Sequence, residues 1–118
     1  MQCQSSCKPF SIFLGDTKTM PINLIYELTG FPVDLTDCTQ IIVYLPNANG
    51  SQAQLDITPD ATVTIISPAI LGQFYASISG AISSLLRVGE NQDIIVSYTI
   101  SGAQKTVRIP NCLSVYQP

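Results

Sequence analysis

Apolar and polar residues alternate along most of the chain. The clearest runs are "MPINLIYEL", "GQFYASIS" and "DIIVSYTIS", in which every second residue is apolar. Because successive side chains of a β-strand point to opposite faces, a period of two predicts strands with one buried face and one wet face. The pattern predicts about eight strands, over residues 10–14, 20–28, 40–46, 52–57, 62–66, 72–79, 92–101 and 104–116, with a break in the last at Pro110-Asn111.

Turn-forming residues separate these runs. Asn49-Gly50 lies between the third and fourth predicted strands, and Asn-Gly tolerates the positive φ angles of a tight hairpin turn. Ser101-Gly102 lies between the last two strands. Only "GAISSLLRVG" has apolar residues at helical spacing, so one short helical turn is expected near 81–87. Strands at this spacing, with no crossover helices between them, predict an antiparallel sandwich or barrel.

The chain divides into an arm and one domain. Its 118 residues are close to the common size of a single domain, about 100–150 residues. The first nine residues, "MQCQSSCKP", show no apolar period and end in a proline. We therefore expect an N-terminal arm over 1–9 that is ordered only where it docks, followed by the β-domain over 10–118.

Charged residues are scarce. They make up 11% of the chain, where about 25% is usual. Serine, threonine, glutamine and asparagine must cover the surface, or another subunit must bury it. Two readings stay open: much of the surface is buried in an assembly, or the protein is a neutral, Ser/Thr-rich β-protein.

The distribution of charge and hydropathy excludes several classes of partner. The net charge is −3 and the five lysines and arginines are scattered, which argues against direct nucleic-acid binding. No apolar run reaches the roughly 18–20 residues of a membrane span, and the N-terminus lacks the features of a signal peptide. We expect synthesis in a cytosol, where the four cysteines would be reduced by default.

The residues that usually carry catalysis are missing or unpaired. The chain has no histidine, which removes the common serine and cysteine triads and the histidine metal sites. Its eight acids stand mostly at turns and strand ends, where aspartate has backbone roles, and no two form a recognisable pair. We expect no enzymatic activity and no cofactor.

The cysteines allow two readings. Cys3 and Cys7 have the spacing of a zinc ligand pair, and Cys38 and Cys112 would complete a four-thiolate site if the arm folded back. The preferred reading treats Cys38 and Cys112 as small buried side chains, because neither has a second ligand close in sequence. A disulfide between Cys3 and Cys7, or from the arm to a neighbour, remains possible outside the cell.

The segment "PVDLTDC" concentrates two acids beside a thiol. Asp34 and Asp37 could contribute to a calcium site, but calcium takes six to eight oxygen ligands and the spacing of an EF-hand is absent. Aspartates also stabilise turns by accepting hydrogen bonds from the backbone. The preferred interpretation is an Asp-stabilised crossover between two strands.

A family resemblance covers residues 10–116. "TMPINLIYELTGFPVDLTDCTQIIVYLPNANGS" resembles the opening of small immunoglobulin-like domains in tailed-bacteriophage virion proteins, such as the N-terminal domain of baseplate upper proteins. Those domains have a "P-hydrophobic-D-L-T-G-A-T" crossover, matched here by Pro32 to Thr39, and a polar hairpin, matched by Asn47 to Gly50. "LGQFYASIS", "LLRVGENQDIIVSYTISGAQKTVRI" and "CLSVYQP" resemble the closing half. The chain departs by having Asp37-Cys38 where Gly-Ala is usual.

The resemblance implies an all-β, antiparallel immunoglobulin-like sandwich of about seven to eight strands, without catalytic residues. It implies a non-enzymatic structural protein of a tailed-phage virion, made in the host cytoplasm and bound to the particle in many copies as a capsid decoration or head-fibre-type protein. One alternative is a tail, neck or baseplate adaptor. Another is a carbohydrate-binding adhesin module, in which Tyr44, Tyr75, Tyr98 and Tyr116 would stack on sugars.

The expected partners are other virion proteins, in capsid or tail, and copies of the chain itself. A stand-alone domain of this kind must bind through its own strand faces and its arm. The candidate interface residues are therefore polar side chains of the strands together with the arm: Cys3, Cys7, Lys8, Ser77, Ser79, Ser97, Thr99 and Ser101.

Overall fold

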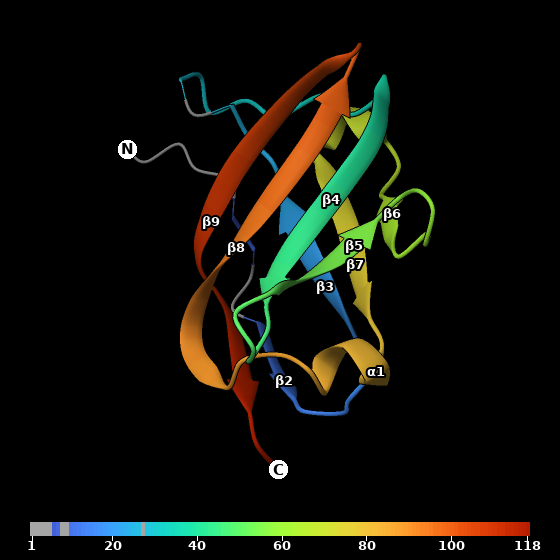
Figure 1. Ribbon diagram of the computed structural model, residues 1–118. Coiled ribbons are helices and arrows are strands. Elements are labelled where there is room, and N and C mark those ends of the chain that lie inside the picture. Colours follow the sequence, from blue (N-terminus) through green and yellow to red (C-terminus); the bar gives the residue numbers. More distant parts are fainter. Residues whose placement is uncertain (1–5, 8–9, 27) are drawn as a thin grey trace.

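Two β-sheets pack face to face in this protein (Figure 1). The computed structural model describes the backbone of residues 6–7 and the whole of residues 10–26 and 28–118. The elements are β1 (Ser6–Cys7), β2 (Phe10–Phe13), β3 (Lys18–Asn23), β4 (Cys38–Pro46), β5 (Gln52–Asp56), β6 (Val63–Ile65), η1 (Ala69–Leu71), β7 (Gln73–Ile78), α1 (Gly80–Ser83), β8 (Gly89–Ile100) and β9 (Ala103–Tyr116).

The strand order is that of an immunoglobulin-like sandwich. One sheet has the order β1-β3-β7-β6 and the other β2-β9-β8-β4-β5. In immunoglobulin lettering these are A-B-E-D and A′-G-F-C-C′, with Greek-key connections between the sheets. The predicted all-β, immunoglobulin-like sandwich is therefore confirmed. One feature lies outside the antiparallel expectation, because β2 runs parallel to β9.

The predicted strands correspond in order to β2 through β9. The largest error is at the end of the strand expected over 20–28, since β3 stops at Asn23. Beyond it the chain forms a separate small hairpin, in which Ile25 bridges to Pro32. The expected helical turn near 81–87 is α1, which lies at the start of that region. The 3₁₀ helix η1 was not expected.

Part of the predicted arm belongs to a sheet. Ser6 and Cys7 form β1, in which Ser6 pairs with Asn23 and Cys7 with Ile22 of β3. The first sheet therefore begins before residue 10, where the domain was expected to start. The rest of the predicted arm, with Cys3 and Lys8, lies outside the described residues, as does the side chain of Cys7.

The core fills the space between the sheets. Alternate residues of the strands are buried, as the period of two requires. Each sheet contributes large side chains that are almost fully enclosed, among them Met20, Ile22, Phe74, Ile78, Ile41, Leu45, Ile94 and Ile109. Neither helix in the described part of the chain has the length and apolar character that crossing a bilayer requires.

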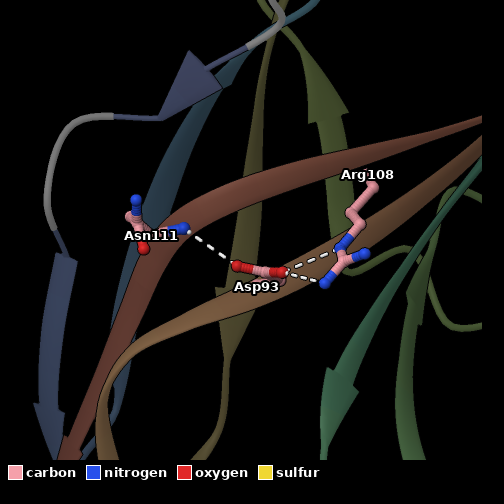
Figure 2. A network of polar contacts seen from close by, with 3 residues as sticks. All are labelled: Asp93, Arg108 and Asn111. Carbon is pink, nitrogen blue, oxygen red and sulfur yellow. Dashed lines mark hydrogen bonds and ion pairs between the residues drawn. The ribbon is translucent and has the colours of Figure 1, made fainter.

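The expected break at Pro110-Asn111 is a bulge in β9. Ile94 pairs with Ile109, but the next pair is Gln92 with Leu113, so β9 has extra residues at this point. Asn111 takes a positive φ of 53°. Figure 2 shows that Asp93 holds the bulge, because its Oδ1 accepts the Asn111 N–H at 3.1 Å.

Asp93 also fixes the side chain of Arg108. Its Oδ2 accepts the Arg108 Nε–H at 2.7 Å and forms an ion pair with Nη2 at 2.6 Å. The hydrogen bond from the Asn111 backbone, followed by the contact with Arg108, lowers the pKa of the Asp93 carboxyl. The bulge and the adjacent strand are thus joined by a single carboxylate.

Candidate binding surface

One end of the sandwich is built by the loop over residues 24–37, which connects β3 to β4. Within it, the Tyr26 N–H donates to the Phe31 carbonyl at 2.9 Å, and the Gly30 N–H donates to the Tyr26 carbonyl at 2.7 Å. These bonds close a small hairpin. The hairpin presents Leu28 and Phe31 to solvent.

This loop is hydrogen-bonded to η1, in the connection between β6 and β7. The Leu24 N–H donates to the Gly72 carbonyl at 2.8 Å, and the Leu35 N–H donates to the Ala69 carbonyl at 3.0 Å. A Cβ at Gly72 would lie 2.5 Å from the Leu24 carbonyl oxygen, and the φ of Gly72 is +68°. Glycine is therefore required where the two loops meet.

Besides Tyr26, which is 39% exposed, the joined loops expose four large apolar side chains. Leu28 is 99% exposed, Phe31 70%, Ile70 56% and Leu71 43%. Single exposed apolar residues are ordinary, but several from adjoining loops indicate an interaction site. We call these four residues the loop patch.

A groove adjoins the loop patch and shares Leu28 with it; residues 25, 26, 28 and 29 line one side and β9 the other. Its volume is about 510 Å³. The lining includes Tyr26 and Tyr98 with Val107, and two cations, Lys105 and Arg108. The Lys105 Nζ lies 5.9 Å from the centroid of the Tyr26 ring, within cation–π range. We call this cavity the edge groove.

Of the four cysteines that the zinc hypothesis combined, the structure describes the side chains of Cys38 and Cys112. Cys112 is buried in the core, as expected, but it is disulfide-bonded, so the expectation of a reduced thiol is wrong there. A sulfur held in a disulfide is no thiolate ligand for zinc. Cys38 is a free, half-buried thiol that donates to the Gln40 carbonyl at 3.3 Å, and burial raises its pKa.

The crossover acids act on the backbone. Asp34 Oδ1 accepts hydrogen bonds from both the hydroxyl and the N–H of Thr36, and these bonds lower the pKa of Asp34. The predicted Asp-stabilised turn is confirmed for Asp34. Asp37 stands in the turn closed by the Cys38 N–H and the Leu35 carbonyl, without a positive φ. Among the described residues, no three His, Cys, Asp or Glu side chains gather as metal ligands.

The predicted polar interface residues do not share one surface. Ser77 is exposed on β7 of the first sheet, whereas Thr99 lies on β8 of the second. Ser79 caps α1, since its Oγ accepts the Ile82 N–H at 3.2 Å. Ser101 is exposed in the turn between β8 and β9. Ser97 is buried beneath Gln104, whose Nε2 donates to its Oγ at 2.8 Å, so Ser97 is no surface contact.

The tyrosines considered for sugar stacking are also dispersed. Tyr75 is exposed on the first sheet and Tyr44 half-buried on the second. The Tyr116 ring packs at a tilt against Phe13, with 5.9 Å between centroids. Tyr98 is buried on the apolar face of β8 and reaches the edge groove.

The sequence reasoning missed Tyr26, Phe31 and η1 as parts of a site. A signal was available, because "YELTGF" departs from strict alternation around a glycine and "PAILG" sets three apolar residues between turn formers. Large apolar residues in turns have no strand face on which to be buried. Such residues are candidates for an exposed contact.

Comparisons with known proteins give only distant structural similarities. No protein-family model matches the chain, and no curated protein matches it. Among solved structures, the chain is similar to the Ig-like domain of human leucine-rich repeat-containing protein 4, with 10% identity, a TM-score of 0.44, and coverage of 97% of this chain and 85% of that one. It is also similar to the Ig1 domain of mouse SynCAM 2, with 10% identity, a TM-score of 0.39, and coverage of 98% and 97%. We base no argument about function on similarities this low.

Proposed function

We propose that the chain is a non-enzymatic structural protein of a tailed-phage virion, which binds the particle in many copies. Attachment to the capsid surface, as a decoration or head-fibre-type protein, is the form we favour. The observation that carries the proposal is the loop patch, four exposed apolar side chains on two loops that are hydrogen-bonded to each other. The phage setting is supported by the resemblance of the crossover and hairpin motifs.

The energetics of such a patch fit attachment in many copies. Complete burial of one large apolar side chain is worth roughly 1.5–3 kcal/mol. Four of them must also offset the lost translational and rotational freedom of association, so one copy binds modestly. An array of copies on a symmetric particle strengthens the attachment through multivalency.

The same patch would serve a tail, neck or baseplate adaptor, so the location on the particle must be measured. A carbohydrate-binding adhesin module is the second candidate. The edge groove favours it, because Tyr26 and Tyr98 border a cavity that also offers polar groups. Aromatic rings with a polar handle suit a ligand that is apolar on one face and polar at its rim.

Co-sedimentation with purified heads and, separately, purified tails tests the proposal. The double variant Phe31→Ser/Ile70→Ser should bind at least about tenfold more weakly, since both apolar contacts are removed. The matched control is Leu85→Ser/Val88→Ser, which changes two apolar residues, 63% and 48% exposed, near α1 at the opposite end (Figure 1). The control should bind like the unaltered chain.

The outcomes separate the candidates. Saturable binding to heads supports a decoration protein, and binding to tails alone supports an adaptor. If neither particle binds the chain while a glycan array gives a signal that Tyr26→Ala abolishes, the adhesin reading replaces the proposal. Equal loss of particle binding in the loop variant and its control would show that the loop patch is not the contact.

A further inference from the structure

We propose that the free edge of β9 binds an extended, acidic peptide segment of a partner protein as an added β-strand. Side chains on one face of that segment would enter the edge groove. This site is distinct from the Phe31 and Ile70 contact used above, and it does not depend on the virion setting.

Over one half of β9, no described strand pairs with the edge that faces away from β8. β2 pairs with β9 only from Phe10 opposite Leu113 to Phe13 opposite Tyr116. Within the described ranges, no strand pairs with residues 103–109 on that side of the sheet. Figure 1 shows this half of β9 continuing to the far end of the sandwich without a strand beyond it.

The register identifies the main-chain groups that point outward. Ser101 and Gly102 have φ angles of 50° and 80°, as a two-residue type I′ turn requires, and Ile100 pairs with Ala103 across it. The two residues that flank such a turn form two hydrogen bonds with each other. Along an antiparallel pair of strands, hydrogen-bonded residue pairs then alternate with pairs whose main-chain groups point away from each other. The N–H and C=O groups of Gln104, Thr106 and Arg108 therefore face away from β8, toward the free edge.

Unpaired strand edges are templates for strand addition. Main-chain hydrogen bonds supply affinity in this mode of recognition, and pockets for alternate side chains supply specificity. Both elements occur together here, since the edge groove runs beside residues 105–108. Tyr98 and Val107 give the groove an apolar lining, which suits one large side chain of the added strand.

The charge of the groove specifies the partner. Lys105 and Val107 are alternate residues of β9 and share its groove face. If an aromatic residue of the added strand lies opposite Val107, the residue two positions along that strand lies opposite Lys105. Among the described side chains, Lys105 has a cation–π contact with Tyr26 and no ion pair, whereas Arg108, also in the lining, is already paired with Asp93. An acidic side chain fits that position.

A second copy of the chain is a poor occupant. The sequence of β9 contains no aspartate or glutamate, so the β9 edge of a second copy offers no opposite charge to Lys105. The other described edge of the same sheet, β5, presents Gln52 and Gln54, which offer no charge to Lys105. The partner is therefore a different, acidic segment.

A synthetic peptide tests the proposal directly. The probe is a fluorescein-labelled heptapeptide, TETFTET, which places phenylalanine and both glutamates on one face of a strand and reads alike in both directions. Its binding to the whole chain is followed by fluorescence anisotropy. Two control peptides remove one feature each: TKTFTKT reverses the charge, and a version N-methylated at alternate amides loses the donors that face β9.

Two protein variants complete the design. Thr106→Pro removes an outward N–H and should weaken binding at least about tenfold, whereas Gln54→Pro makes the same change on the β5 edge and should leave it unchanged. Lys105→Glu should weaken the binding of TETFTET by at least about tenfold. This variant should bind TKTFTKT more tightly than TETFTET. Circular dichroism and thermal unfolding confirm that each variant is folded.

Three results would overturn the proposal: no binding of TETFTET, equal binding of the N-methylated peptide, or unchanged binding by folded Thr106→Pro. The Phe31→Ser/Ile70→Ser variant should keep its affinity for the peptide. Loss of particle binding without loss of peptide binding, or the reverse, therefore tells the two proposals apart.

Discussion

The two halves of β9 belong to one strand and share the partner β8, yet they differ in what lies on their other side. Residues 113–116, the covered half, pair with β2, and Leu113 and Val115 are fully buried. Residues 103–109, the free half, have no strand beside them in the described structure, and most of their side chains are exposed up to Thr106. The covered half belongs to the core, and the free half remains available to a partner.

The bulge at Asn111 separates the two halves. It inserts extra residues into β9 and changes the register with β8. The residues before the bulge and those after it can therefore have different neighbours on the side of β9 that faces away from β8. The free half also carries Lys105 and Arg108, and charges on an edge are a common protection against unwanted pairing. Charged side chains on this edge can thus favour an acidic partner strand and disfavour pairing with other strands.

The largest difference between the halves should appear when side chains are shortened. Leu113→Ala removes a fully buried side chain and should lower the free energy of unfolding by about 2–5 kcal/mol. Val107→Ala, at a partly buried position in the free half, should lower it by about 1 kcal/mol or less. Urea denaturation of both variants measures this, and equal losses would contradict the division of β9 into a core half and a surface half.

Proline substitution separates the halves through the backbone. The Leu14 N–H donates to the Tyr116 carbonyl at 3.0 Å, so Ser114, two residues earlier, also directs its main-chain groups toward β2. Ser114→Pro removes a ladder hydrogen bond and should cost about 1–3 kcal/mol of unfolding free energy. Thr106→Pro, whose N–H faces solvent, should cost about 0.5 kcal/mol or less. Thermal unfolding compares them, and a larger loss for Thr106→Pro would show that the edge is not free.

The strands could be predicted because their signal is local. Apolar residues at every second position define a strand wherever one face is buried, and the Ser101-Gly102 turn and the Pro110-Asn111 break are also marked by short sequences. The disulfide at Cys112 has no such signal. A small buried thiol and a half-cystine look alike along the chain, and only the approach of another part of the fold distinguishes them.

The candidate site was less predictable for a related reason. Alternation placed Ser97 correctly on the outer face of its strand, but it could not show that Gln104 covers it. Phe31 and Ile70 are apolar residues of turns, and alternation does not say whether such residues are buried. They are exposed because two loops from different parts of the sequence meet at Gly72, an arrangement that only the folded structure defines.

The smallest effect concerns the carboxylate that holds the bulge between the halves. The pKa of Asp93 is lower in the folded protein than its ordinary value, so its contribution to stability is complete above about pH 4, near the unfolded pKa, and is lost as the pH falls through the folded pKa. Asp93→Asn keeps the shape but removes the charge, so the variant should unfold at a lower temperature than the unaltered chain at pH 7, and the difference should shrink toward pH 2.

Asp34→Asn is the matched control, because the pKa of Asp34 is also lowered but its bonds go to Thr36 in the crossover. Only Asp93→Asn should also loosen the bulge, seen as faster amide hydrogen exchange at Asn111, whose N–H donates to Asp93. Unchanged exchange at Asn111 would show that the negative charge of Asp93 is not needed to hold the bulge between the two halves.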